Sequence, residues 1–186
     1  MNNDTNINTN INRQLFLGED VTESSVKQLI EEIRKINKYD DEQEAEKKEY
    51  ERKPIELIVS SFGGCAYSGF ALVSTILLSK TPVHTICLGK AMSMGFLIFV
   101  AGHKRYAHRL STFMYHEIRG WNHGELTQVK RTLEEWERLQ NLYDEYVLKR
   151  TSLLKEKLDE VKEKCLDWYI SAEEAKKLGI VDELLE

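Results

Sequence analysis

The centre of the sequence alternates twice between a short apolar segment and a helical one, with a glycine-containing turn after each apolar segment. Strands are expected over residues 55–59 and 83–88, and helices over residues 67–78 and 96–101. Gly63-Gly64 follows the first strand, and Gly89 closes the second strand before a turn over residues 91–95. Strands that alternate with helices in this way predict an α/β fold with a parallel sheet and right-handed crossovers.

Shorter segments on either side extend this pattern. Further strands are expected over residues 14–17, 104–107 and 112–115, and further helices up to about residue 37, over 125–149, over 153–164 and after Ser171. Asp20 and Glu23 have capping-box spacing before the first helix, and Ser171 and Glu174 have it before the last one. Gly179 stands where the last helix is expected to end.

The 186 residues suit one domain, which we assign to residues 13–186. Residues 1–12 are rich in Asn and Thr and predict a disordered or partner-ordered tail. This tail has neither a basic start nor an apolar run, so it is not expected to be a signal peptide. Residues 38–53 are nearly all charged and predict a solvated helix extension or loop inserted into the domain.

Composition narrows the classes of function. The net charge of −5 argues against nucleic acid as a partner, because phosphate binding needs a basic surface. The longest apolar runs, such as residues 96–101, are too short to cross a bilayer. Cys65, Cys87 and Cys165 lack the spacing of a disulfide framework and fit a reducing compartment. A cytoplasmic protein with no membrane or nucleic-acid partner is therefore expected.

The two glycine-containing turns place backbone N–H groups where a helix begins. Such groups have no acceptor within the helix and lie at the positive end of its dipole. The amides of Gly64 and Met94 are the natural pair to bind a developing oxyanion. A tight turn without any ligand is the alternative for Gly63-Gly64.

Ser93 lies inside the second turn, so its hydroxyl is expected at the mouth of the sheet. The position resembles a nucleophile elbow, although the GxSxG pattern is absent; helix capping is the alternative. A nucleophilic serine needs a base. Of the five histidines, His116 is best placed because it ends the strand at 112–115, and a structural histidine is its alternative. Asp167 is the candidate third member, since the apolar stretch 168–170 that follows it indicates a fixed, partly buried position.

The segments that carry these residues resemble, in order and nearly in spacing, the proteolytic subunit of the Clp protease, ClpP. They are RQLFLGEDVTESSVKQLIEEI at 13–33, Gly63-Gly64, AMSMG at 91–95, AGHKRYA at 101–107, FMYHE at 113–117 and DWYISAEEAKKLGIVDELL at 167–185. The resemblance covers about residues 13–37 and 54–186. It implies a ClpP/crotonase-like α/β fold of stacked ββα units with a protruding handle helix over residues 125–149.

The resemblance also implies the roles of single residues. Ser93, His116 and Asp167 match the catalytic triad, Gly64 and Met94 match the oxyanion hole, and neither a metal nor another cofactor is needed. The segment IRGWNHGE resembles the strand that pairs with an extended polypeptide substrate, through Ile118, Arg119, Gly120, Trp121 and Gly124. The family plan is a homo-oligomeric ring, a heptamer or double heptamer, served by an AAA+ unfoldase. The chain departs from the family in its tail, in residues 38–53 and in Trp168, which replaces an arginine.

The expected function is that of a serine endopeptidase acting on unfolded or extended polypeptides inside an oligomeric chamber. Two alternatives stay open. One is a catalytically inactive ring subunit that keeps the fold. The other is a crotonase-type acyl-CoA hydratase or isomerase, which shares the scaffold and the oxyanion hole, although no CoA-binding feature is recognisable in the sequence.

Overall fold

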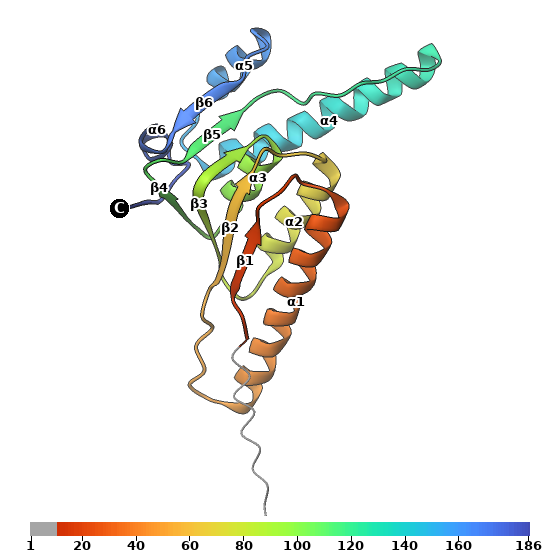
Figure 1. Ribbon diagram of the computed structural model, residues 1–186. Helices are drawn as coiled ribbons and strands as arrows, with labels where there is room; N and C mark the ends of the chain where they lie inside the picture. The colour runs from red at the N-terminus through yellow and green to blue at the C-terminus, as the bar shows by residue number, and fades with distance from the viewer. Residues whose placement is uncertain (1–10) are drawn as a thin grey trace, which may run out of the picture.

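The computed structural model describes residues 11–186, so the predicted tail lies almost entirely outside the described residues. The strands are β1 (Gln14–Leu17), β2 (Ile55–Ser61), β3 (Val83–Met92), β4 (Lys104–His108), β5 (Thr112–Tyr115), β6 (Trp168–Ser171) and β7 (Glu183–Leu185). The helices are α1 (Glu23–Glu46), α2 (Ala66–Leu78), α3 (Met94–Val100), α4 (Leu126–Arg150), α5 (Lys155–Glu163) and α6 (Ala172–Lys177). Figure 1 traces these elements along the chain.

Parallel pairing dominates the sheet, which confirms the predicted α/β class. Strands β1, β2, β3, β4 and β7 follow one another in that order and pair in parallel. β3 has two neighbours on one side, because residues 84–87 pair with β4 and residues 90–92 pair with β5. β6 then pairs antiparallel with β5. The long strand β3 therefore connects the main sheet to the β5–β6 pair.

The switch between these two neighbours of β3 coincides with a bulge. Val59 of β2 pairs with Cys87, but Ser61, two residues further, pairs with Ala91, four residues further along β3. The prediction that Gly89 closes this strand is wrong, since the strand continues to Met92. Gly89 instead lies in the bulge, where extra residues in one strand bend it and increase its twist. The bend directs the end of β3 toward β5.

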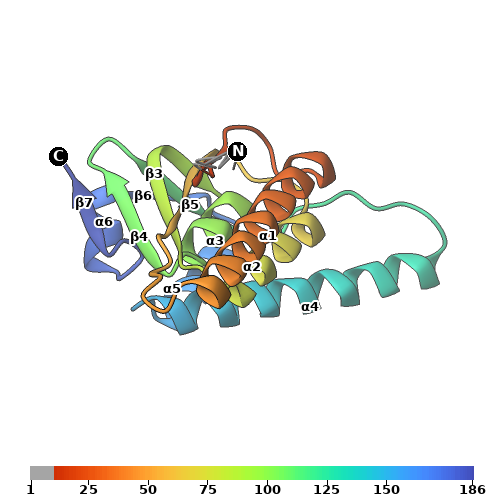
Figure 2. The same cartoon turned by 90° about the horizontal axis from the view of Figure 1, so that it is seen from below.

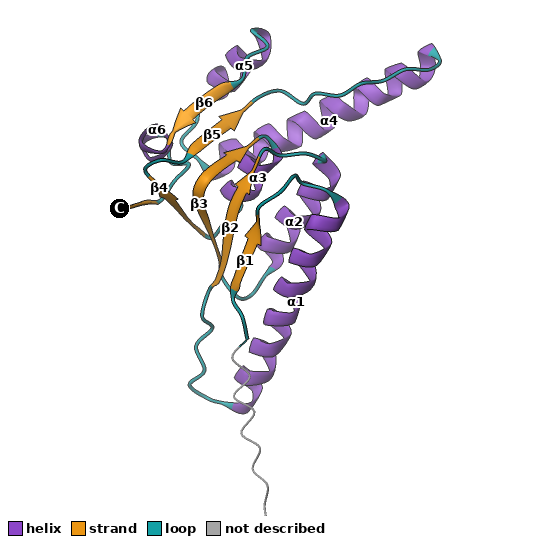
Figure 3. Ribbon diagram, viewed as in Figure 1, coloured by secondary structure: helices purple, strands orange, loops and turns teal. Residues whose placement is uncertain are grey.

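Helices α1, α2 and α3 cover one face of the sheet (Figures 1 and 2). The inward side chains of β2, Ile55, Leu57 and Val59, are fully buried under this layer, as are most residues of α3. Helix α4 extends beyond the sheet as a projecting rod, with the loop that precedes it running alongside (Figure 3). No helix among the described residues has both the length and the apolar character to cross a membrane.

The first helix begins later than predicted. Its N-cap is Thr22, whose side chain accepts a hydrogen bond from Ser25 N–H while the Ser25 hydroxyl accepts one from Thr22 N–H. The predicted capping box of Asp20 with Glu23 is therefore wrong by two residues. The helix continues nine residues past Asn37, to Glu46, so the first part of residues 38–53 is the helix extension that was one of the two predicted alternatives. Contacts with Tyr50 and Arg52 of the loop that follows stabilise this extension.

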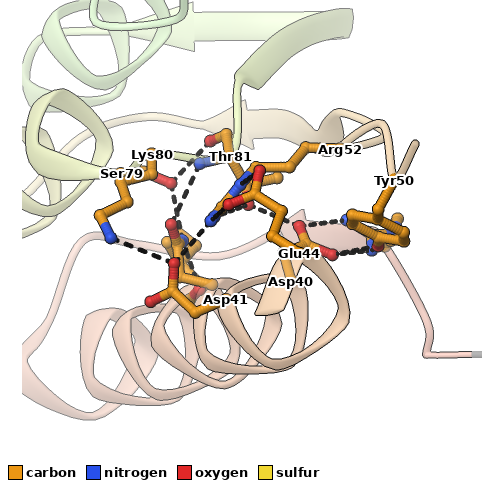
Figure 4. Close-up of polar contacts among 11 residues, drawn as sticks. Asp40, Asp41, Glu44, Tyr50, Arg52, Ser79, Lys80 and Thr81 are labelled. Carbon is orange, nitrogen blue, oxygen red and sulfur yellow. Dashed lines mark hydrogen bonds and ion pairs between the residues drawn. The ribbon is translucent and has the colours of Figure 1, made fainter. Parts of the chain in front are cut away.

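Those contacts centre on Asp40, which is completely buried within the charged insertion. Its carboxylate accepts hydrogen bonds from Arg13, from the Tyr50 hydroxyl at 2.5 Å and from the Thr81 hydroxyl at 2.6 Å (Figure 4). Beside it, Arg52 pairs with two carboxylates of the same helix. Burial alone would raise the pKa of Asp40, but these hydrogen bonds outweigh it and lower the pKa. The expectation of a merely solvated insertion is wrong at this position, since the network ties α1 to β1 and to the start of β3.

Candidate active site

Ser93 occupies a sharp turn between β3 and α3. Its backbone has φ 51° and ψ −124°, a conformation that costs free energy in a residue other than glycine and is typical of exposed nucleophiles on strand-to-helix turns. Ser93 N–H donates to Met114 O at 2.9 Å, and the Tyr143 hydroxyl donates to Ser93 O at 2.9 Å. Although Ser93 is at the N-cap position of α3, its side chain makes no capping hydrogen bond. The capping alternative therefore does not account for this serine.

The Gly63-Gly64 turn packs directly against the Ser93 turn. A Cβ atom on Gly63 would lie 2.7 Å from Ser93 Cβ and 2.9 Å from Met94 N, so only glycine permits this approach. Both glycines also have positive φ, 104° and 145°. Among the described residues, neither Gly64 N–H nor Met94 N–H donates to a protein acceptor. Two free amides thus stand on adjoining turns beside the serine, as an oxyanion hole requires.

A cavity of about 310 Å³ opens in front of this turn. It brings together Ser93, His116, Gly64, Met94 and residues 118–121 of the predicted substrate segment. Its other walls are Cys65, Ala66, Tyr67, Trp136, Leu139 and Tyr143. Tyr67 of α2 reaches across to Glu135 of α4 with a hydrogen bond of 2.8 Å, which links the two walls. The cavity therefore brings the candidate nucleophile and the candidate base together in a lining of mixed polar and apolar character.

His116 follows β5 directly and is half-buried at the edge of this cavity. Its Nδ1 atom is buried and has no hydrogen-bond partner within residues 11–186. Burial lowers the pKa of His116, the Arg119 cation lowers it further, and the Asp167 carboxylate opposes both effects. A lowered pKa keeps the imidazole neutral, and only the neutral form can take a proton from a serine.

A buried polar network, which the sequence analysis did not find, holds the residues on both sides of His116. The Tyr115 hydroxyl donates to Asp144 at 2.5 Å, and Gln140 donates to the same carboxylate at 2.7 Å. Gln140 Oε1 accepts from Ile118 N–H at 2.7 Å, and Lys162 closes the network on Asp144 at 2.6 Å. Helix α4 thereby fixes the backbone before and after the histidine.

Asp167 lies beside His116 but is bound to another residue. β6 runs antiparallel to β5 with Tyr115 opposite Trp168, so the next pair in that register is His116 opposite Asp167. Opposite residues in such a pair have Cα atoms about 4.5–5.5 Å apart. The carboxylate nevertheless pairs with Arg119, at 2.5 Å, and within the described chain His116 shares no hydrogen bond with Ser93 or Asp167. The Asp167 side chain keeps 34% of its exposure. Its position is therefore fixed by the ion pair with Arg119 at the surface, and not by burial.

The segment over residues 118–124 forms no strand in this structure. Its backbone lies on α4, where the ring of Trp136 fills the space in which Gly120 would carry a Cβ. Trp121 and His123 stack with ring centroids 4.5 Å apart, and Gly124 has φ 140°. The segment is therefore next to the serine, as predicted, but is not arranged as a strand.

The remaining histidines lie elsewhere in the fold. His103 Nδ1 contacts the backbone of Val83, and His108 Nδ1 accepts from Leu110 N–H. His84 packs against Tyr106 on the open face of the sheet. Over residues 11–186, no cluster of three or more His, Cys, Asp or Glu side chains is arranged to hold a metal ion.

Comparison with known protein families identifies the family of the chain. The sequence model of the Clp protease family, described as Clp protease, matches residues 3–186. The match spans the Ser93 turn, His116, Asp167 and both glycine turns, as well as the projecting helix α4. The chain belongs to the Clp protease family.

Proposed function

We propose that the protein is a serine endopeptidase with Ser93 as nucleophile, His116 as general base and Asp167 as the group that orients the base. The observation that carries the proposal is the contact between the two turns, which puts a strained, half-buried serine at the wall of the cavity beside two free backbone amides. Membership of the Clp protease family supports the same class of chemistry. Peptide hydrolysis by acyl transfer needs this arrangement and no metal.

In this mechanism Ser93 Oγ attacks the substrate carbonyl while His116 takes its proton. The amides of Gly64 and Met94 bind the oxyanion, and the loss of one such donor typically raises the barrier by about 3 kcal/mol. His116 then gives the proton to the leaving amine, and water releases the acyl-enzyme. Asp167 fixes the imidazole tautomer and stabilises its charged form, for which it must bind His116 Nδ1.

The proposed substrate is an extended polypeptide that lies along residues 118–124. Backbone pairing with this segment supplies affinity with little dependence on sequence. The apolar walls at Trp136 and Leu139 favour an apolar side chain in the cavity beside Ser93.

We further propose that the chain assembles as a homo-oligomeric ring that encloses these sites in the cytoplasm. Phe16 and Leu88 are exposed on the open face of the sheet, and Leu126 and Leu133 are exposed on α4. Apolar surface of this kind supports association with further copies. The three cysteines are free, in keeping with a reducing compartment. An ATP-driven unfoldase that delivers unfolded chains is proposed on the family plan alone.

A second candidate function is a ring subunit without catalytic activity. The ion pair between Arg119 and Asp167 favours it, because the carboxylate is bound away from the histidine. A fluorophosphonate probe distinguishes the two functions, since it reacts only with an activated serine. We expect one label per chain in the wild type, no label in Ser93→Ala, and full labelling in the control Ser68→Ala, which changes a half-buried serine of α2. Undiminished labelling of Ser93→Ala would exclude Ser93 as nucleophile.

A further inference from the structure

The carboxylate of Asp167 is held by two hydrogen bonds from a single arginine. Arg119 Nη2 donates to Oδ1 at 2.5 Å, and Nη1 lies 3.4 Å from Oδ2. This two-point contact is the arrangement in which a guanidinium group binds carboxylates best. Arg119 belongs to the proposed substrate segment that follows His116. A residue of this segment therefore binds the Asp167 carboxylate that should orient His116.

His116, in turn, lacks a hydrogen-bond partner for one of its ring nitrogens among the described residues. Its Nδ1 atom is buried and unpaired in the described part of the chain, and an unpaired buried polar atom costs free energy. The charged groups that act on its imidazole are Arg119, Asp167 and Glu117. The titratable groups on the α2 and α4 sides of the cavity are Cys65, Tyr67 and Tyr143. Among the charged groups, Asp167 stands opposite His116 in the register of β5 and β6.

We propose that Arg119 is a positioning residue that keeps the triad uncoupled by competing with His116 for the Asp167 carboxylate. Catalysis begins when Asp167 exchanges its hydrogen bonds to Arg119 for one from the Nδ1–H of His116. The inference rests on the proposed peptidase function. The exchange breaks and forms only hydrogen bonds, and both Arg119 and Asp167 are partly exposed, so water can solvate the freed guanidinium.

An extended substrate provides a reason for the exchange. Side chains of a strand alternate between its two faces, and residues 118–124 become a strand only when a peptide pairs with them. The Cβ direction of Gly120 already points at Trp136 of α4 and so defines one face, while the backbone N–H of Ile118 donates to Gln140 of the same helix. Arg119 then belongs to the other face and leaves its present contact. The base is thereby oriented only while a peptide is bound.

The test compares Arg119→Gln with Arg109→Gln. Arg109 is a matched control, because its side chain is 59% exposed against 57% for Arg119 and it also pairs with a carboxylate, at 3.9 Å. The measurement is the second-order rate of fluorophosphonate labelling from about pH 5 to about pH 9, which brackets the usual pKa of histidine. We expect Arg119→Gln to raise the plateau rate about fivefold. This factor corresponds to the upper end of the free energies that exposed ion pairs contribute.

The pH profile must move as well. Because Arg119 lowers the pKa of His116, its removal raises that pKa and shifts the acid limb of the profile to higher pH. The gain must also vanish in an Asp167→Asn background, where there is no carboxylate to release. An unchanged rate and limb relative to Arg109→Gln, or the same gain in the Asp167→Asn background, would overturn the inference. If the wild type is labelled and Ser93→Ala is not, the proposed peptidase function stands even when the inference about Arg119 fails. If no variant is labelled, Arg119→Gln included, both the peptidase function and the inference about Arg119 are refuted.

Discussion

Asp144→Ala tests whether the buried network on α4 supports His116, the proposed general base. The carboxylate accepts hydrogen bonds from the Tyr115 hydroxyl, from Gln140 and from Lys162, at 2.5, 2.7 and 2.6 Å. Truncation leaves all three donors without this acceptor. Burial, followed by the bond to Asp144, raises the pKa of Tyr115, so this hydroxyl stays protonated and cannot escape the loss by ionising.

The size of the effect follows from burial. Removing one partner of a buried ion pair costs about 3–5 kcal/mol. The Lys162 side chain keeps 21% of its exposure and can recover water, whereas Tyr115 is fully buried. We therefore expect a loss of about 3 kcal/mol in the free energy of unfolding, near the lower end of the range for a broken buried pair.

The assay is urea unfolding at one fixed protomer concentration, because assembly would otherwise change the apparent stability. With a slope of about 2 kcal/mol per molar urea, the midpoint should fall by about 1.5 M. Glu145→Ala is the control, since Glu145 is the next residue on α4 and is exposed. Fluorophosphonate labelling of the folded variant should also slow, because Tyr115 and Ile118 flank His116. A midpoint within the error of Glu145→Ala would refute the reasoning.

Two further outcomes are expected. Gly63→Ala should slow labelling of Ser93 about 100-fold, which is the effect of losing one oxyanion-hole donor. The added Cβ would lie 2.7 Å from Ser93 Cβ at a backbone φ of 104°, so the two turns could not keep their contact. Labelling at the wild-type rate would contradict the proposed oxyanion hole. The folded-state pKa of Asp40 lies below its usual value of 3.8, so its contribution to stability is complete above that pH and is lost as the pH falls through the lower, folded-state value. Unfolding measured along a pH series should show this acid slope in the wild type and a weaker one in Asp40→Asn, and identical slopes would contradict it.

Much of the fold follows from local sequence signals. Apolar runs of strand length, separated by helices and glycine turns, are enough to predict the parallel sheet, to place Ser93 in a strand-to-helix turn and to place His116 at the end of a strand. Errors occur where tertiary contacts override the local signal. Gly89 suggests an end to β3, but pairing with β5 carries the strand onward. The charged run after Asn37 suggests solvent exposure, but Arg13 and Thr81 bury one of its carboxylates.

The candidate site could likewise be predicted only in part from the sequence. The residue types and the positions of the serine, the histidine and the glycines are visible in sequence. The partner of Asp167 is not, because Arg119 lies 48 residues away and nothing local distinguishes it from other surface arginines. Asp144 is hidden for a related reason, since it is one of 31 acidic residues and sits on a helix in which ten of the 25 residues are charged. Only the packing of α4 against β5 shows that it is buried.

The bulge in β3 also determines how the chain can vary in length. Between Cys87 and Ala91 the strand leaves β4, passes the bulge and joins β5. A strand alternates its side chains with a period of two, so one inserted or deleted residue here would turn Ala91 outward and carry Ser93 to the wrong side of the turn. The insertion after Asn37, far from this point, changes no register. Natural or engineered insertions should accordingly be tolerated in the exposed residues 47–49 that follow α1 and excluded from these few residues ahead of the serine.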